Sequence, residues 1–490
     1  MGILLGILTT FVVALPQDGD TRIWRDSSGA YSTKAKMEVK AEDEVTADVV
    51  LIKESGERVT VPFNVLDAAG QRFAKQLRQQ AKNNPSSSTA SNSEVRSWNW
   101  RGPNGDGIST EEGLMSQWPQ DGPPLDWSAD GLGKGLSSLA IADGKIFTLG
   151  NRGGSEHIIA LSLQDGSELW ATRIGNGGDP NSTPTYHDGF VYGLGRGGDL
   201  CCVRAEDGQK VWSKNFAGDF GGKMMSQWGY SESPLVDDGK VICTPGGPRA
   251  MIVALNYKTG QTIWSAPMPP GGSRGKDGAG YSSPVVSNGG GIKQYITLVG
   301  RGLISVDART GRPLWQYEKI ANGTANVPTP IVDGNFVFCS SGYSDGGTAL
   351  LQLTKRGPSV NWREVYYFKA NQLQNHHGGM IKIGDYVYMG EGHNNGFPTC
   401  VSFRTGQRTW PKQRGAGERS AAIVAADGHL YFRYENGVMA LIEANPQSYN
   451  LKGSFQIASR NGESWPHPVI YDGKLYLRDQ HQLHCYSIKN

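Results

Sequence analysis

The sequence lacks a strong charge of either sign, a hydrophobic run long enough to cross a bilayer, and any paired-cysteine motif. Its formal net charge is only +2, so composition favours neither a nucleic-acid nor a membrane-surface partner. The apolar run from Ile3 to Leu15 is too short for a transmembrane span. None of the six cysteines has the spacing of a zinc site or of a Cys-x-x-Cys-His haem attachment.

The same apolar run is typical of a secretory signal. Val12-Val13-Ala14 fits a small-residue cleavage site, although no Lys or Arg precedes the run. We therefore expect residues 1–16 to be a signal peptide. The mature chain would then be exported, to the periplasm, the cell surface or the extracellular space.

Glycine and tryptophan are abundant, with 67 and 13 residues, which indicates many short strands and tight turns. Residues 17–82 contain two alternating apolar segments, a turn at Ser55-Gly56 and then apolar residues at helical spacing. They predict a small β domain that ends in a helix. Residues 83–97 are rich in Ser and Asn and predict a flexible linker.

From Trp98 to Asn490 the chain repeats a four-strand unit. Each copy begins with a hairpin, and Asp-Gly is a strong signal for a two-residue hairpin turn. The eight first turns are predicted at Asp143-Gly144, Asp188-Gly189, Asp238-Gly239, Asn288-Gly289, Asp333-Gly334, Gly384-Asp385, Asp427-Gly428 and Asp472-Gly473. Six copies end in a tryptophan: Trp170, Trp212, Trp264, Trp315, Trp362 and Trp410. This spacing predicts an all-β, eight-bladed β-propeller of four-stranded blades.

The count also predicts how the ring closes. Leu125-Asp126-Trp127 reads as a fourth strand with no blade before it, and the eighth copy lacks a fourth strand. We expect the segment around Trp127 to complete the last blade, which removes the open sheet edges.

The segment from Ala254 to Trp264 resembles the tryptophan-docking motif of pyrroloquinoline-quinone (PQQ) type propellers, and Ala160 to Trp170 and Ser305 to Trp315 are close variants. The resemblance implies that each Trp stacks against the Gly-containing turn of the neighbouring blade. It covers residues 98–490 and is specific for the fold. It does not specify the cofactor, because the same repeat builds non-catalytic propellers such as the outer-membrane assembly scaffold.

The front domain resembles the SH3-like homology domain of a yeast endocytic adaptor, a type that binds Asn-Pro-Phe peptides. Arg22-x-Trp24-x-Asp26-x-x-Gly29 and the stretch from Gly56 to Pro62 carry this likeness. The resemblance implies a possible peptide partner for the N-terminal domain.

Three motifs suggest sharper chemistry, and in each a structural interpretation is favoured. Cys201-Cys202 resembles the adjacent cysteines of PQQ alcohol dehydrogenases, but Cys202 aligns with small residues of the third strand, where a buried Cys packs well. Residues 104–107 lack the later ligands of a calcium loop. Adjacent His376 and His377 point to opposite faces of a strand, so we expect no metal there.

The candidate binding site consists of residues just before the first strand of several blades, because the innermost strands of a propeller meet at the channel mouth. We expect Tyr230, Tyr281, Asn326, His376, Arg419 and His467 to line one pocket there. Arg419 would bind an anion in bidentate fashion. In the alternative interpretation these polar groups only bond one another and the loop backbone.

The favoured function is therefore an exported binding or scaffold protein, with a protein partner or a small molecule at the propeller mouth and no cofactor. The alternative is a PQQ-dependent alcohol or sugar dehydrogenase, which needs calcium, an Asp base and an Arg at the quinone. The sequence does not supply the full set of these residues by motif. A partner of a polysaccharide-degrading system is a third possibility without direct support.

Overall fold

The computed structural model describes residues 22–27, 32–38, 48–53, 58–71, 74–75, 97–268, 270 and 272–490. The chain divides into two compact units, residues 1–95 and 96–490. The predicted signal peptide, the turn at Ser55-Gly56 and residues 83–96 of the predicted linker lie outside the described residues.

The first unit contains one antiparallel sheet in the order β1-β2-β3-β4. Its elements are β1 (Arg22–Arg25), β2 (Ser32–Glu38), β3 (Val49–Lys53), β4 (Arg58–Val61) and the short 3-10 helix η1 (Phe63–Val65). Val49 and Leu51, at alternate positions of β3, are buried against Phe63 and Leu66. The alternation in the sequence thus places one face of the sheet on a small core.

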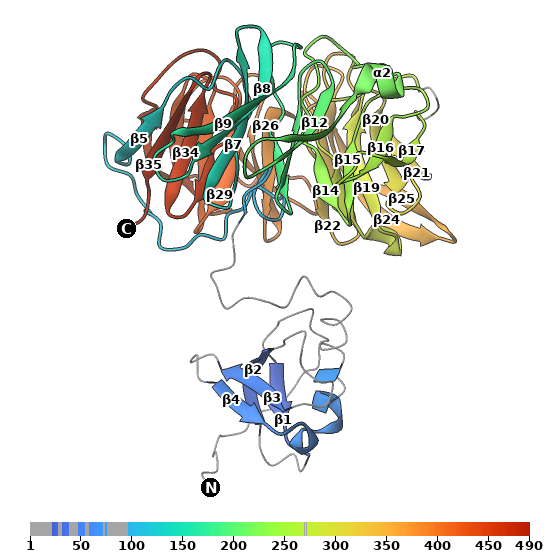
Figure 1. Ribbon diagram of the computed structural model, residues 1–490, viewed down its shortest axis with the longest axis vertical. Coiled ribbons are helices and arrows are strands. Elements are labelled where there is room, and N and C mark those ends of the chain that lie inside the picture. Colours follow the sequence, from blue (N-terminus) through green and yellow to red (C-terminus); the bar gives the residue numbers. More distant parts are fainter. Residues whose placement is uncertain are drawn as a thin grey trace. The chain divides into compact units, whose positions relative to one another are not determined.

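The second unit is an eight-bladed β-propeller, which confirms the predicted fold class for this part of the chain (Figure 1). The first three blades consist of β6 (Ala140–Ala142), β7 (Lys145–Arg152), β8 (Ser155–Ser162) and β9 (Glu168–Gly175); β10 (Thr185–His187), β11 (Phe190–Leu194), β12 (Asp199–Arg204) and β13 (Lys210–Asn215); and β14 (Leu235–Asp237), β15 (Lys240–Cys243), β16 (Ile252–Asn256) and β17 (Thr262–Ala266). A short helix, α2 (Phe216–Phe220), follows β13.

The fourth to sixth blades consist of β18 (Val285–Ser287), β19 (Gln294–Val299), β20 (Gly302–Asp307) and β21 (Pro313–Tyr317); β22 (Ile331–Asp333), β23 (Phe336–Ser341), β24 (Gly347–Arg356) and β25 (Ser359–Lys369); and β26 (Asn375–Ile383), β27 (Tyr386–Glu391) and β28 (Phe397–Ser402). The seventh and eighth consist of β29 (Ala421–Ala426), β30 (His429–Tyr434), β31 (Val438–Glu443) and β32 (Leu451–Gln456); and β33 (Val469–Tyr471), β34 (Lys474–Asp479), β35 (Gln482–Ser487) and β5 (Leu125–Ala129).

The ring closes as predicted. β5 pairs antiparallel with β35, and Trp127 lies opposite Cys485. In Figure 1 the teal β5 lies beside the red β35, although the two strands come from opposite ends of the propeller sequence. The eighth blade therefore receives its outer strand from the start of the domain.

The sixth blade departs from the prediction of four strands in every blade, because its sheet has only three. A single bridge between Val401 and Arg408 stands where the fourth strand would be. After Trp410 the chain continues with Pro411, which has no N–H to donate to a ladder. The pairing therefore does not extend beyond this bridge, and no fourth strand forms.

Five predicted Asp-Gly turns have positive φ at both central residues, as a type I′ turn requires; in the first, Asp143 has φ 51° and Gly144 has φ 69°. Two predictions need correction. Residues 289–291 form the 3-10 helix η3 (Gly289–Gly291), so Asn288-Gly289 is not a tight turn. Asp333 pairs with Phe336 as the last residue of β22, so that turn consists of Gly334 and Asn335.

The tryptophan-docking expectation is confirmed for three of the six closing tryptophans, Trp170, Trp212 and Trp264. A Cβ atom added to Gly311, which has φ +72°, would lie 2.4 Å from a ring atom of Trp264 in the preceding blade. The same relation joins Gly208 to Trp170 and Gly260 to Trp212, at 2.5 and 2.7 Å. Only glycine tolerates both the positive φ and this close approach.

The six cysteines are free and buried. Cys201 and Cys202 are consecutive residues of β12, and burial raises the pKa values of their thiols to about 11 and about 12. They pack as small apolar side chains between blades, as the alignment predicted. Among the described helices, none has the length and hydropathy needed to span a membrane.

Candidate functional site

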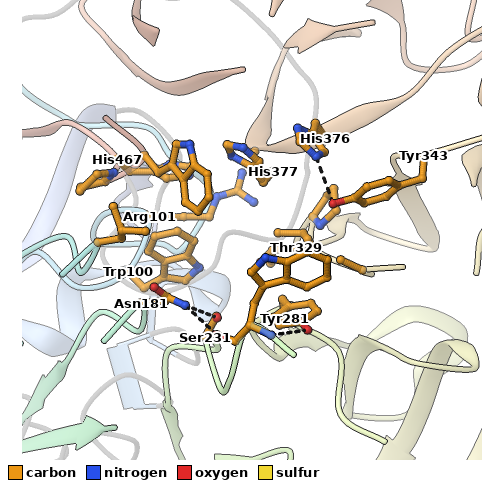
Figure 2. A pocket seen from close by; sticks show the side chains of 18 residues that line it. Trp100, Arg101, Asn181, Ser231, Tyr281, Thr329, Tyr343, His376, His377 and His467 are labelled. Atoms are coloured by element: carbon orange, nitrogen blue, oxygen red, sulfur yellow. Dashed lines mark hydrogen bonds between the residues drawn. The ribbon is translucent and has the colours of Figure 1, made fainter. Parts of the chain in front are cut away.

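A cavity of about 340 Å³ lies at the upstream ends of the innermost strands; we call it the loop cavity (Figure 2). Six of its lining residues each stand four positions before the first residue of an innermost strand, and each comes from a different blade. These residues are Leu136, Asn181, Ser231, Tyr281, Val327 and Trp465. The equivalent residue of six different blades thus contributes to the wall of the cavity.

The chain segment 97–109, which we call the channel segment, crosses the axis and supplies the remaining wall. Trp98 exchanges two backbone hydrogen bonds with Ile141 of β6, both 2.8 Å long. At the far end of the segment, the N–H of Ala425 in β29 donates to the carbonyl oxygen of Gly107 at 2.8 Å. Trp100 and Arg101 between these anchors line the loop cavity.

Three histidines line one side of the loop cavity, opposite Asn181, Ser231 and Tyr281 (Figure 2). The His376 ring centroid lies 4.4 Å from that of His377, and His467 packs edge-on against Trp100 at 4.7 Å. His376 Nδ1 lies 2.7 Å from the Ser420 hydroxyl. The histidines therefore form a packed imidazole wall.

Burial keeps these imidazoles neutral. It lowers the pKa of His376 to about 2, with help from the neighbouring His377 and His393. It also lowers the pKa of His377 to about 3, with help from His467 and His393, and the pKa of His467 to about 3, with help from the cationic Arg101 and Arg433. At neutral pH the histidine wall carries no charge.

Among the described residues that line the loop cavity, Arg101 alone has a side chain with a fixed charge, and it is buried. Burial lowers its pKa to about 10, and Asp106 opposes that change, so the guanidinium stays cationic at neutral pH. Its Nη2 donates to the carbonyl oxygens of Asp106, at 3.2 Å, and of Met380. No Asp or Glu of the described part of the chain lines the cavity.

Three buried polar atoms of the lining lack a hydrogen-bond partner among the described residues: Trp100 Nε1, Trp465 Nε1 and His377 Nε2. An indole nitrogen can only donate. Arg101 adds a cation to a lining of aromatic side chains, which suits a planar anionic molecule.

The structure brings three of the six predicted site residues together at the loop cavity: Tyr281, His376 and His467. The other three lie elsewhere. The Tyr230 hydroxyl donates to the carbonyl oxygen of Pro245 at 2.8 Å, and Asn326 Nδ2 donates to that of Val299 at 2.9 Å, both away from the cavity. Arg419 pairs with Glu435 at 3.0 Å beside a separate cavity of about 320 Å³.

Register explains why Tyr230 and Asn326 do not line the cavity. Tyr281 stands four residues before its strand, whereas Tyr230 and Asn326 stand five residues before theirs. Neighbouring side chains of an extended segment point to opposite sides. The spacing of four residues, read from the repeat, would also have found Asn181, Ser231 and Trp465. Nothing local marks Trp100 or Arg101, because long-range pairing carries them to the axis.

The residues of the loop cavity do not fit a calcium-bound quinone. Calcium takes six to eight oxygen ligands, with carboxylates prominent among them. None of the described residues that line this cavity has a carboxylate. Across the described part of the chain, no cluster of three or more His, Cys, Asp or Glu side chains has the geometry to hold a metal ion.

A family model described as outer membrane protein assembly factor BamB matches residues 154–412. Among curated proteins, the BamB of Salmonella typhimurium is 32% identical over 128 residues, which are 25% of this chain and 29% of that protein. The BamB of Burkholderia pseudomallei is 26% identical over 219 residues, 43% of this chain and 53% of that protein. The chain thus spans about half or less of the length of the curated relatives it matches.

Solved structures share the fold. BamB from Moraxella catarrhalis has a TM-score of 0.54 at 14% identity, covering 75% of this chain and 100% of that one. The quinohemoprotein alcohol dehydrogenase from Comamonas testosteroni has a TM-score of 0.56 at 12% identity, covering 81% of each chain. At these identities the likeness concerns the fold alone.

Proposed function

The chain belongs to the family of the outer membrane protein assembly factor BamB, and we propose on that premise that it is an exported binding scaffold rather than an enzyme. Its propeller is a rigid ring, and the loop cavity is its site for a small ligand or for a group presented by a protein partner. The relatives' name describes a factor in the assembly of outer membrane proteins. A protein partner of this chain is accordingly part of the proposal.

The observation that carries this function is the donor set of the loop cavity. It holds a buried cation, two unpartnered indole N–H groups and neutral imidazoles, with no carboxylate in the lining. A dehydrogenase of the PQQ type needs a carboxylate both for calcium and as a base. The cavity is equipped to hold an acceptor-rich planar anion and has no group equipped to oxidise an alcohol with it.

The domain organisation supports a second binding surface. We propose a signal peptide at residues 1–16, an SH3-like domain at 17–82, a flexible linker at 83–97 and the propeller at 98–490. The four antiparallel strands of the first unit support the SH3-like assignment, and a peptide is its proposed ligand.

Tryptophan fluorescence tests the cavity, with PQQ as a planar tricarboxylate probe in the presence and absence of calcium. We expect saturable quenching that does not depend on calcium, and no dye-linked oxidation of alcohols. Trp465→Phe removes an N–H that has no partner among the described residues. It should therefore lower the affinity for PQQ by about fivefold while the protein stays folded. Arg309→Gln, at an exposed arginine outside the cavity, is the matched control.

Calcium-dependent dye reduction would replace the proposal with the dehydrogenase alternative. Quenching that is absent, or equal in Trp465→Phe and the unchanged protein, would show that the loop cavity does not take such anions.

A further inference from the structure

A second cavity, of about 460 Å³, lies on the other side of the channel segment, toward the first hairpin turns; we call it the turn cavity. Its volume is within the range of ligand pockets, about 300–1,000 Å³. Residues 99–106 of the channel segment form one wall, and the innermost strands β14, β18 and β22 form the other. Trp100 and Arg101 separate it from the loop cavity.

The innermost strand of each blade has an inner edge, whose backbone groups face the axis. In β6 the residue at this edge is the second one, Ile141. Trp98 of the channel segment forms hydrogen bonds of 2.8 Å with both the N–H and the carbonyl oxygen of Ile141. In β10 the second residue is Tyr186. Its N–H donates to Asn99 Oδ1 at 2.7 Å, and its carbonyl oxygen accepts from Asn99 Nδ2 at 3.0 Å.

The channel segment also reaches the sixth, seventh and eighth blades. Arg101 donates to Met380, Gly107 accepts from Ala425, and the Ser109 hydroxyl donates to Ile470 at 3.3 Å. The third, fourth and fifth blades receive no such contact within residues 97–490, apart from 269 and 271. Their inner edges are those that line the turn cavity.

The residues equivalent to Ile141 in those blades are Val236, Val286 and Val332. Each is the second residue of its three-residue strand and has the same register with the next strand. Alternate residues of an antiparallel strand direct their backbone groups to opposite sides, so these three direct an N–H and a C=O toward the axis. No hydrogen bond from another described segment meets them.

The surroundings of these free groups are polar and apolar in about equal parts. Leu235, Val285 and Ile331, the first residues of the three strands, line the same cavity and are half-buried. Lys382, which also lines the cavity, is paired with Asp333 at 3.2 Å. Lys382 is thus committed to Asp333, and the other cation of the lining, Arg101, donates to the backbone carbonyls of Asp106 and Met380. A polypeptide backbone, in contrast, finds free partners of both kinds here.

We propose that the turn cavity captures a short extended peptide, which pairs antiparallel with the inner edge of β14, β18 or β22 as Trp98 pairs with β6. Each strand offers one N–H and one C=O, so one peptide residue forms the bridge. The next residue of the peptide reaches the adjacent blade, as Asn99 reaches Tyr186. An apolar bridging residue followed by Asn or Gln is the sequence that this geometry selects. The inference concerns a different cavity from the proposed function and does not rest on it.

The probe is the capped peptide acetyl-Ala-Val-Asn-Ala-amide, added to the full chain. Its matched control is the same peptide with a methyl group on the amide nitrogen of Val, which keeps every side chain and removes the bridging donor. We expect the unmethylated peptide to slow amide hydrogen exchange in the segments that contain Val236, Val286 or Val332. We expect methylation to weaken binding by about tenfold, the effect of one hydrogen bond of about 1.4 kcal/mol.

On the protein side, Val286→Pro removes an N–H that makes no bond to another segment, and proline is tolerated at such an edge. The double variant Val236→Pro, Val286→Pro should bind the peptide more weakly, with no change in PQQ binding at the loop cavity. If the proline variants do not fold, the methylated peptide still tests the bridge. Equal affinity of the two peptides, no binding at millimolar concentration, or equal protection by inorganic phosphate would each overturn the proposal.

Discussion

Arg433 donates a hydrogen bond from Nη2 to the carbonyl oxygen of Arg478, so its buried guanidinium group joins the seventh blade to the eighth. Arg478 in turn donates to the carbonyl oxygens of Ser137, at 3.3 Å, and Leu149 on the side of the first blade. Burial lowers the pKa values of Arg433 and Arg478 to about 10 and about 9, so both remain cationic at neutral pH. The blades on either side of the closure are therefore linked by side chains as well as by β5.

Arg478→Met should destabilise the protein by about 3 kcal/mol, because it leaves several buried carbonyl oxygens without a donor. Urea denaturation measures the change. Arg309→Gln, at an exposed arginine, should change the free energy of unfolding by less than about 0.5 kcal/mol. Equal stability of the two variants would show that β5 alone maintains the closure.

Trp264→Ala should cost about 3–5 kcal/mol, because the ring is 8% exposed and packs on Gly311 of the next blade. Its neighbour Ile263 is 48% exposed and provides the control, since Ile263→Ala should have little effect. Thermal and urea unfolding compare the two. A loss below about 1 kcal/mol for Trp264→Ala would contradict the docking role.

The folded protein should react slowly with a thiol reagent at pH 8, because its cysteines are buried and burial raises the pKa values of their thiols. After unfolding in guanidinium chloride without reductant, six thiols should react. A count of four would show a disulfide, and Cys201→Ser would then test whether the adjacent pair forms it.

Stability should fall as the pH drops below about 6.5. An unfolded chain protonates its histidines near that pH, whereas burial holds the pKa values of His376, His377 and His467 at about 2 to 3 in the folded protein. The contribution is thus fully present above pH 6.5, and each imidazole removes about 1.4 kcal/mol per pH unit below it.

Denaturation at pH 7.5, 6.0 and 5.0 measures this slope. His377→Asn should make it shallower, and the exposed His187→Asn should leave it unchanged. Parallel curves for all three proteins would mean that His377 is protonated in the folded state.

Deleting residues 1–97 should leave a propeller that unfolds cooperatively with unchanged stability, because Trp98 is the first of the described residues that pairs with a blade and the chain divides into two compact units before it. Deleting residues 1–109 should destabilise it, since Trp98 is buried and the channel segment is lost. Circular dichroism during thermal unfolding compares them. Loss of cooperativity in the shorter deletion would mean that the two units depend on each other.

The fold was accessible from sequence because its signals are local. Asp-Gly turns, and the glycines that face Trp170, Trp212 and Trp264, are short motifs that recur from blade to blade. The failures were also local. The predicted turn at Asn288 is instead part of a longer connection that contains a 3-10 helix. The strand predicted around Trp410 does not form, because Pro411 follows it.

The site was less accessible. Which residues line the cavity depends on a difference of one position. Tyr281 stands four residues before its innermost strand and lines the cavity, whereas Tyr230 stands five residues before its strand and does not. Its charge depends on Arg101, which reaches the axis because Trp98 and Gly107 bridge distant blades. Such contacts join residues far apart in the chain and leave no periodic trace in the sequence.

The pairing of β5 with β35 has a consequence for the order of events during biosynthesis. Ser128 and His484, which are hydrogen-bonded across this pair, are 356 residues apart. A ribosome adds about 5–20 residues per second, so the outer strand waits roughly 20 to 70 seconds for its partner to be made. During that interval β5 is an unpaired strand, and exposed strands of this kind favour aggregation before folding is complete.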